Sequence, residues 1–468
     1  MDAVAAVDLG ATSGRVMIGY IGHNELSVRP VARFPNGPVE SAGELHWDVT
    51  RLYGNVLDGL GAALREEHDI ASIGVDSWAV DYALLKDGMR LGEVFHYRDP
   101  RNEPAAGAVH DRVSAADLYA ANGLQYLPFN TLYQLAAERD LAAADSFLLV
   151  PDLFGFWFTR RQVAERTNAS TTGLLNIGTG RWDDALIERL ALPRSIFPEL
   201  VDAGSIVGPV EPRTAYEIGA WGPIDVVAVG SHDTASAVVA VPATTEDFAY
   251  ISCGTWGLVG VELERPVLSD ASRKANFTNE GGVDGRVRYL HNVMGLWLLS
   301  ECVREWQRDD STVELPGLLA AASALETPVP QFDANDPGFL APGDMPSRIA
   351  RWCRDHGLPV PATRVEFVRC IIESLAVAFA DSVRNASELS GKRVSVIHIV
   401  GGGSQNELLC QLTADRSGLP VLAGPVEATA IGNVLVQARA QGFVSGSLEA
   451  LRALVASAFS PKRYLPRG

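Results

Sequence analysis

The chain has 468 residues, of which 47% are hydrophobic and 21% are charged. This length is typical of two or three domains, and the composition excludes a chain that is disordered or collagen-like as a whole. With 39 basic and 57 acidic residues, the formal net charge is −18. Such a charge argues against a nucleic-acid-binding protein, because the phosphates would be repelled.

The lysines and cysteines exclude several further classes. The chain has Lys86, Lys274, Lys392 and Lys462 as its lysines, and none stands in a GxxxxGK[ST] motif, so we exclude a P-loop NTPase. The 5 cysteines form no CxxC pair, which disfavours a disulfide framework and a zinc site and is usual in a reducing cytosol. We therefore expect free thiols, although Cys353 and Cys370 could pair if their backbones approach.

The chain carries no sign of a membrane or secretory segment. Asp2 and Asp8 stand where a signal peptide needs positive charge, and no apolar run is long enough to span a bilayer. We expect a soluble cytoplasmic protein with no membrane partner.

Short apolar runs alternate with helical patterns along the chain, which is typical of α/β proteins. We predict a strand at 4–8, a glycine-bearing turn at 9–14 and a second strand at 15–20. A similar unit returns at 248–263, and the polar stretch 242–247 lies just before it. The two hairpins, each with Gly and Thr at its tip, indicate two similar halves that meet near this stretch.

Further elements are expected in the second half of the chain. Asn292 is predicted to precede a helix at 293–307 and thus to be its N-cap, and 327–347 reads as a loop or a lid. Apolar spacing predicts a helix at 366–390 that ends near Gly391. Further strands are expected at 394–400 and 420–423, and further helices from about 406 and at 427–441.

The turn that follows the first strand is a candidate phosphate-binding loop. Its small residues let the backbone approach an anion, and the hydroxyls of Thr12 and Ser13 can join the backbone N–H groups. Arg15 adds a positive charge, and Asp8 could hold magnesium through water. A tight hairpin turn without a ligand is the alternative, and the residues leave both open. Gly254 and Thr255 repeat this design in the second hairpin.

The triplet Gly401 to Gly403 lies between a predicted strand and a predicted helix, where α/β proteins bind ligands. Backbone without side chains allows a nucleotide base or ribose to approach closely. Binding of NAD would require an acidic residue about 20 residues further on. Leu422, Ala423 and Gly424 stand there instead, so NAD is disfavoured.

Asp233 follows a predicted strand at 226–229 and opens a helix, so it is a candidate to accept a hydroxyl proton during phosphoryl transfer. The alternative is an N-cap aspartate. Ser231, His232 and Asp233 are adjacent in the chain and cannot line up as a catalytic triad. Trp78 and Asp81, after another strand, suit a sugar, but they also suit a buried tryptophan beside a turn.

These segments together resemble the FGGY carbohydrate kinases, a branch of the actin-like ATPase folds, and most closely the rhamnulokinase branch of that family. The resemblance covers nearly the whole chain and rests on AVDLGATSGRV, GVDSWAVDYALL, PFNTLYQL, TNASTT, SHDTASAV, YISCGTW, NEGGVDGR, NVMGLWLL, HIVGGGSQN and GPVEATAIGN. DLGxxSGR and GGG are shared widely in the family. PFNTLYQL, SHDTASA and NVMGLWLL carry the resemblance to the branch.

The resemblance implies an α/β fold with two actin-like (ribonuclease H-like) domains and a cleft between them. Residues 1–243 would form an N-terminal domain with the sugar site, the first phosphate loop and the catalytic aspartate. Residues 244–468 would form a C-terminal domain that binds the nucleotide and holds the second phosphate loop. ATP and Mg²⁺ are the implied cofactors, a small ketose is the implied substrate, and the protein would be a monomer or a small homo-oligomer.

The family pattern also implies roles for matching residues. Asp233 would be the general base, Asp8 would hold the metal through water, and Ala79, His232, Thr234 and Asn292 would line the sugar site. The nucleotide would contact Ala11, Thr12, Ser13, Gly14, Arg15, Thr255, Ser300 and Gly402. The family usually has Gly where this chain has Ala79, so Ala79 adds a methyl group beside the substrate. It often has Gln where this chain has Ser300, so Ser300 removes a contact to the nucleotide.

The activity that this resemblance implies is phosphorylation of L-rhamnulose by ATP at the C1 hydroxyl, a step of L-rhamnose catabolism that gives L-rhamnulose 1-phosphate and ADP. A different ketose, L-fuculose, L-ribulose or D-xylulose, is the first alternative, since one methyl or hydroxyl group is worth only about 1–3 kcal/mol in an apolar pocket. A nucleotide-dependent scaffold is the second. The sugar-side residues and Asp233 argue against a scaffold, and NAD-linked oxidoreduction ranks last.

Overall fold

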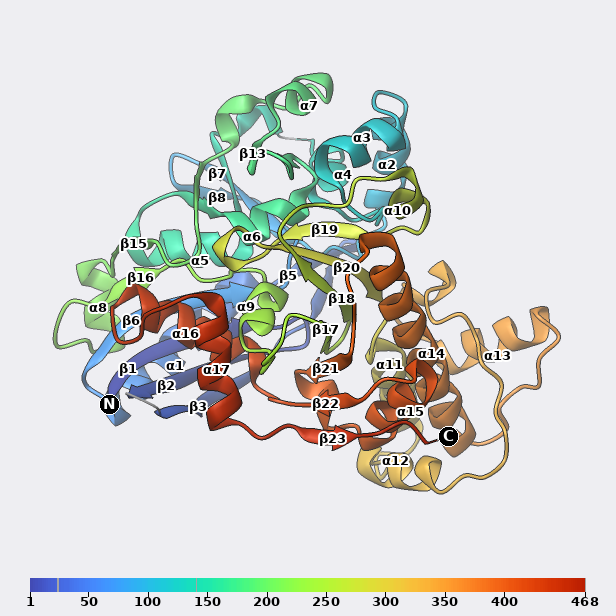
Figure 1. Cartoon of the computed structure of the whole chain (residues 1–468). Helices are drawn as coiled ribbons and strands as arrows, with labels where there is room; N and C mark the ends of the chain where they lie inside the picture. Colours follow the sequence, from blue (N-terminus) through green and yellow to red (C-terminus); the bar gives the residue numbers. More distant parts are fainter. Residues whose placement is uncertain (23–24, 140, 468) are drawn as a thin grey trace. The chain divides into compact units, whose positions relative to one another are not determined.

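The structure is a computed structural model that describes residues 1–22, 25–139 and 141–467 (Figure 1). It divides into two compact units. The first unit comprises Met1–Thr244, Glu262–Tyr289 and Glu427–Phe459, and the second comprises Thr245–Val261, Leu290–Val426 and the chain from Ser460 onward.

The first of these boundaries lies one residue from the division predicted between 243 and 244. The segments Glu262–Tyr289 and Glu427–Phe459 lie after that division in the sequence but belong to the first unit. The reason is that strand β19 (Thr278–Gly281) and helices α16 (Ala428–Ala440) and α17 (Leu448–Ala458) pack on elements of the first unit. A single cut in the sequence cannot describe units that the chain enters more than once.

The first unit is built on a twisted mixed sheet with the strand order β15-β16-β6-β1-β2-β3. Strand β1 is antiparallel to β2 and parallel to β6, and its apolar sequence is buried from Ala3 to Leu9, as expected for a strand covered on both faces. The predicted first hairpin is therefore confirmed. The strands are β1 (Asp2–Leu9), β2 (Ser13–Gly22), β3 (Glu25–Pro35), β6 (Ile70–Ser77), β15 (Ile206–Pro209) and β16 (Asp225–Val227).

Helices cover both faces of this sheet. Gly59 of α1 (Val49–Glu66) lies against Val16, and Gly19 lies against Val434 of α16. Because alternate residues of a strand point to opposite faces, α1 and α16 pack on opposite sides of β2. Helix α16 also packs on β1 and β6, so a helix from near the carboxyl end of the chain completes a core begun by the first strand.

Residues between β6 and β16 form a second hydrophobic core within the first unit. Tyr82, Phe147, Trp182 and Phe197 are among its buried members. The helices of this region are α2 (Asn102–His110), α3 (Ala115–Asn122), α4 (Thr131–Ala136), α5 (Val150–Thr159), α6 (Arg166–Ala169), α7 (Asp184–Arg189) and α8 (Pro212–Ile218). The strands of the same region are β7 (Tyr82–Lys86), β8 (Met89–Leu91), β9 (Val94–Phe95), β10 (Ser146–Leu149), β11 (Val163–Glu165), β12 (Leu175–Asn176), β13 (Arg181–Trp182) and β14 (Glu199–Val201). Helix α9 (Asp233–Val239) follows β16. Strands β4 (Pro38–Ser41) and β5 (Glu44–Trp47) precede α1, and α10 (Asp270–Lys274) precedes β19.

The second unit contains the other predicted hairpin, β17 (Phe248–Cys253) and β18 (Gly257–Leu263). Strand β17 is parallel to β21 (Val396–Val400), and β22 (Val421–Ala423) and β23 (Lys462–Tyr464) follow at its edge. Helix α14 (Arg364–Ser390) begins with a capping box and ends at Gly391, whose φ of 72° is left-handed, as predicted. Helix α15 (Glu407–Ser417) packs on α14, and α11 (Trp297–Asp309), α12 (Leu315–Ser323) and α13 (Met345–Asp355) complete the helices.

Two expectations differ from the structure. Asn292 lies in strand β20 (Val287–Val293) and not at a helix N-terminus, because the strand continues to Val293 and α11 begins only at Trp297. Strand β23 lies in a stretch for which the sequence predicts no element. Among the described residues, no helix combines the length and the apolar character needed to cross a membrane.

Candidate active site

The first hairpin tip has the form of a closed turn with small, accessible residues. Gly10 N donates to Ser13 O at 2.9 Å, and Asn36 holds the tip by donating from Nδ2 to Gly10 O and from its backbone N to Thr12 O. Thr12 is exposed, and Ala11 and Ser13 are partly exposed. Side chains and N–H groups at this tip are therefore accessible to an anion.

Asp8 and Arg15 face each other across the base of this hairpin. Arg15 Nε lies 3.1 Å from Asp8 Oδ2, and Arg15 Nη1 pairs with Glu427. Burial raises the pKa of Asp8 to about 6, which the charge of Arg15 opposes. The guanidinium of Arg15 is thus shared by two carboxylates.

Asp76 lies beside Asp8, since the two residues are paired at the carboxyl ends of parallel strands β6 and β1. Asp76 Oδ2 accepts from Asn433 Nδ2 at 2.6 Å, and Gln437 of the same helix donates to Asn433 Oδ1. Asp76 Oδ1 is buried without a hydrogen-bond partner. Burial, and after it the charge of Asp8, raise the pKa of Asp76 well above its usual value.

These carboxylates fit a hydrated divalent cation. The charge of Asp233 also raises the pKa values of Asp8 and Asp76, so the three side chains repel one another when they are ionised. A cation would relieve that repulsion and satisfy Asp76 Oδ1, and Mg²⁺ prefers carboxylate oxygens while it keeps several waters. Among the described residues no group of three or more His, Cys, Asp or Glu is close enough to hold a metal directly, so binding through water fits best.

Asp233 lies at the same edge of the sheet, as the first residue of α9. Ser77 at the end of β6 bridges to His232, and Ser77 N donates to Ser231 O at 2.9 Å. His232 and not Asp233 is the N-cap of α9, so the Asp233 carboxylate is not engaged in capping, and the alternative role as an N-cap is wrong. Its side chain is 32% exposed, and its Oδ1 accepts a hydrogen bond of 3.2 Å from the hydroxyl of buried Thr234.

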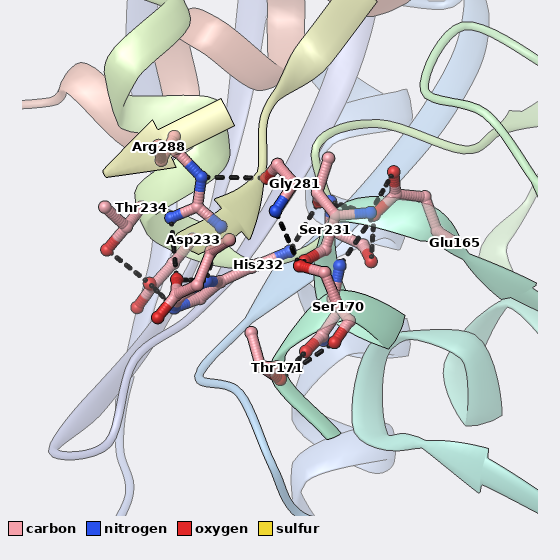
Figure 2. Close-up of polar contacts among 12 residues, drawn as sticks. Glu165, Ser170, Thr171, Ser231, His232, Asp233, Thr234, Gly281 and Arg288 are labelled. Atoms are coloured by element: carbon pink, nitrogen blue, oxygen red, sulfur yellow. Dashed lines mark hydrogen bonds and ion pairs between the residues drawn. The ribbon is translucent and has the colours of Figure 1, made fainter. Parts of the chain in front are cut away.

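His232 is buried between Asp233 and an arginine (Figure 2). His232 Nε2 lies 3.4 Å from Asp233 Oδ1, and His232 Nδ1 lies 3.0 Å from Arg288 Nη2. Glu280 Oε2 lies 3.1 Å from Arg288 Nη1 and 3.3 Å from His232 Nδ1. Burial favours a higher pKa for Glu280, but Arg288 and His232 outweigh it and hold that pKa below its usual value. Glu280 is therefore ionised at neutral pH.

Two side chains hold the backbone of this cluster in place (Figure 2). Glu165 Oε2 accepts hydrogen bonds from the N and the Oγ of Ser231, at 3.0 and 2.9 Å. Ser170 Oγ accepts from Gly281 N at 2.7 Å. The segment that begins at Glu165 thus anchors both the residue before His232 and the residue after Glu280.

The residues around Trp78 form an aromatic cluster. Trp47 and Trp78 have ring centroids 4.1 Å apart, and both donate from Nε1 to Asp81 Oδ2, at 2.6 and 3.0 Å. Gln134 donates to the other oxygen of Asp81 at 2.8 Å. Trp78 and Asp81 thus serve the interior of the protein, as the alternative interpretation held, and only Ala79 between them is partly exposed.

The second hairpin tip, in the second unit, is held by the start of α11. Leu296 N donates to Gly254 O at 3.1 Å, and Trp297 N donates to Thr255 O at 3.0 Å. Gly295 has a φ of 59°, and a Cβ there would lie 2.6 Å from Thr255 O, so only glycine fits this approach. Ser300 is exposed on α11, one turn beyond the tip.

The glycine triplet of the second unit packs on the same hairpin. A Cβ at Gly403 would lie 2.6 Å from the Cβ of Cys253, and one at Gly401, whose φ is 81°, would lie 3.1 Å from Cys253 O. Gly402 is exposed, with nothing within 4 Å of a Cβ position. Thr255 and Gly402 therefore stand on adjoining loops at the carboxyl ends of β17 and β21.

The structure places the predicted residues in two groups. In the first unit, Asp8 lies near the end of β1, and His232, Asp233 and Thr234 follow β16, which β6 separates from β1 in the sheet. Ala11 to Arg15 form the hairpin tip that follows β1. In the second unit, Thr255 and Gly402 stand on adjoining loops, Ser300 lies on α11 one turn beyond the hairpin tip, and Asn292 lies near the end of β20.

The sequence interpretation missed several polar residues of the first group, namely Asp76 as a partner of Asp8, and Glu280, Arg288, Glu427 and Asn433. A signal existed for Glu280 and Arg288, because each is a charged residue inside a buried strand.

Comparison with known proteins adds the following. The family model described as "FGGY family of carbohydrate kinases, N-terminal domain" matches residues 3–240, and that for the C-terminal domain matches 249–441. A rhamnulokinase from Bacteroides thetaiotaomicron is 40% identical over 99% of this chain and 95% of that protein.

Among solved structures, a xylulose kinase from Lactobacillus acidophilus has a TM-score of 0.80 at 17% identity, over 100% of this chain and 94% of that one. A glycerol kinase from Plasmodium falciparum with ADP has a TM-score of 0.78 at 16% identity, with the same coverage. The two-domain α/β kinase fold expected from the sequence is thereby confirmed.

Proposed function

The chain belongs to the FGGY family of carbohydrate kinases, and we propose that it transfers the γ-phosphoryl group of ATP to the C1 hydroxyl of L-rhamnulose. The products are L-rhamnulose 1-phosphate and ADP. The observation that carries this choice of substrate is the 40% identity, over 99% of the chain, to a rhamnulokinase. At the lower identity of 17%, the likeness to a xylulose kinase concerns the fold alone.

Asp233 is the proton acceptor in this proposal. Its carboxylate opens α9 at the carboxyl edge of the sheet and makes no capping bond. Thr234 and His232 face Oδ1, so we assign Oδ2 to the C1 hydroxyl of the sugar. Asp233 orients that hydroxyl and takes its proton as the oxygen attacks the γ-phosphorus.

The nucleotide is assigned to the residues that the family pattern implies. Ala11, Thr12, Ser13 and Gly14 would approach the phosphates with backbone and hydroxyl groups, and Arg15 would exchange Glu427 for a phosphate oxygen. Thr255, Ser300 and Gly402 are also assigned to the nucleotide. Mg²⁺ held through water by Asp8, beside Asp76, would neutralise phosphate charge.

The sugar is assigned to Ala79, His232, Thr234 and Asn292. Ala79 is the partly exposed residue between Trp78 and Val80, and its methyl group would limit the space beside the sugar.

A cytoplasmic monomer or small homo-oligomer suits this reaction, and the five cysteines are free thiols, as is usual in a reducing compartment.

The test is ADP release from ATP–Mg²⁺ with L-rhamnulose, L-fuculose, L-ribulose, D-xylulose and glycerol as acceptors. We expect the highest kcat/KM with L-rhamnulose. Asp233→Asn should lower kcat by roughly 10²- to 10⁴-fold and leave ATP binding intact, because it removes the proton acceptor and not a nucleotide contact. Asp270→Asn, in an exposed ion pair with Arg273 and Lys274, is the matched control.

Preference for another ketose would support the kinase activity but refute L-rhamnulose as the substrate. ATP binding without sugar-dependent ADP release would favour a scaffold, and retention of most turnover in Asp233→Asn would remove Asp233 from its role.

A further inference from the structure

A fully buried arginine lies directly behind His232. Arg288 has 0% of its side chain exposed, in a strand that is otherwise apolar from Val287 to Leu290. Its Nε donates to Gly281 O at 2.9 Å, and its two terminal nitrogens face Glu280 and His232. Burial of a guanidinium costs several kcal/mol even when it is paired, so stability alone does not explain an arginine at this position.

The contact between Arg288 and His232 fixes where the imidazole carries its proton. A guanidinium has only donors and does not lose its proton in proteins. Arg288 Nη2, 3.0 Å from His232 Nδ1, therefore requires a lone pair on Nδ1. A neutral imidazole with a lone pair on Nδ1 carries its hydrogen on Nε2, and Nε2 is the nitrogen that faces Asp233 Oδ1 at 3.4 Å.

Glu280 is the one competitor for this proton in the cluster. Its Oε2 lies 3.3 Å from His232 Nδ1, close enough to attract a hydrogen there. However, Oε2 lies closer to Arg288 Nη1, at 3.1 Å, and among the neighbouring groups the charge of Arg288 does most to hold the pKa of Glu280 below its usual value. Glu280 thus compensates the charge of Arg288, and Arg288 keeps Nδ1 for its own hydrogen bond.

We propose that Arg288, compensated by Glu280, is a positioning residue that sets the tautomer of His232 and through it the orientation of the Asp233 carboxylate. The inference rests on the proposed role of Asp233 as the proton acceptor. With Nε2–H toward Oδ1, His232 and Thr234 hold one carboxylate oxygen and leave Oδ2 for the substrate. The other tautomer would present a lone pair to Oδ1 and would repel the carboxylate.

The backbone around the cluster is built to keep this geometry. Ser170 holds Gly281, next to Glu280, and Glu165 holds Ser231, next to His232. Since both anchors come from one short segment, Glu280 and His232 keep their separation. The imidazole orientation is then decided by Arg288 and not by movement of the backbone.

The first experiment observes the tautomer in the wild-type protein. The 15N chemical shifts of the imidazole nitrogens distinguish a protonated from an unprotonated nitrogen. They are recorded on protein labelled at its 9 histidines, with His232→Gln to assign the signals. We expect Nδ1 unprotonated and Nε2 protonated. A proton on Nδ1 of the wild type would overturn the proposal, whatever happens to the variants.

The second experiment uses Arg288→Met and Arg288→Lys. Methionine removes the donor, so the hydrogen should move to Nδ1 toward Glu280, and kcat should fall by roughly 10- to 100-fold with an unchanged KM for ATP. This range is the one found for groups that orient metal-ligating histidines through their second ring nitrogen, a comparable positioning role. Lysine, a cation with donors only, should restore the wild-type tautomer and part of kcat.

Arg452→Met is the matched control. Arg452 is 3% exposed and pairs with buried Glu262, so its loss removes a similar ion pair but should leave the His232 signals unchanged. Equal losses of kcat in Arg288→Met and Arg452→Met would overturn the proposal. Absence of sugar-dependent turnover in the wild type would instead refute the proposed function, and the two failures are thereby distinguished.

Discussion

The contact of Gly432 with helix α9 leads to a prediction that links packing to catalysis. Gly432 lies in α16, and a Cβ at this position would lie 2.6 Å from the carbonyl carbon of Ser236 and closer still to its oxygen. For that carbon to reach 3.4 Å, an ordinary van der Waals distance, the two helices would have to separate by about 0.8 Å, and the nearer oxygen requires a larger shift. Ser236 lies three residues after Asp233 in α9, so this shift would move the proposed proton acceptor.

The expected magnitude has two parts. Overpacking in a core costs typically about 1–3 kcal/mol, and the better helix propensity of alanine returns at most about 1 kcal/mol. We therefore expect Gly432→Ala to lower the free energy of unfolding by about 1–2 kcal/mol. A misplacement of about 1 Å can cost 10²-fold in rate, so we expect kcat to fall by roughly 10- to 100-fold.

The assay compares urea midpoints and kcat with those of Gly54→Ala. Gly54 lies in α1, is exposed and has nothing within 4 Å of a Cβ position, so alanine there should be neutral or slightly stabilising. If Gly432→Ala retained both the midpoint and kcat of the wild type, α9 and α16 would not be in the contact described. If it lost stability but kept kcat, the link from this contact to Asp233 would be refuted.

Two further predictions concern titration and the nucleotide loop. Burial raises the pKa of Asp81 from its ordinary value of 3.8 to about 7, so the folded state binds this proton more tightly than the unfolded chain. The contribution of this proton to the free energy of unfolding, about 4 kcal/mol, is lost as the pH rises from about 4 to 7. Asp81→Asn should therefore remove the fall of the urea midpoint over this pH range. An unchanged dependence of the midpoint on pH would contradict this assignment. Gly403→Ala should lower Tm, because its Cβ would lie 2.6 Å from the Cβ of Cys253, whereas Gly402→Ala should keep Tm and raise KM for ATP. Equal melting temperatures of the two variants would contradict this reasoning.

The hairpins and the position of Asp233 could be predicted from sequence because their signals are local. An apolar run, then small residues and a second apolar run, predict β1 and β2, and apolar spacing with Gly391 predicts α14 and its end. The helix predicted after Asn292 began too early. An apolar run does not separate the end of a strand from the start of a helix, and Gly295, with its φ of 59°, makes that separation in the fold.

The sequence by itself determined the α/β class, the two glycine-bearing hairpins and the identity of the side chains at the strand ends, because these depend on neighbours in the chain. Only the tertiary structure decided that Asp8 stands beside Asp76, that α16 returns to cover β1, and that Arg288 contacts His232. Each of these contacts joins residues more than 50 positions apart. Their partners are chosen by sheet order and helix packing, which no short stretch of sequence encodes.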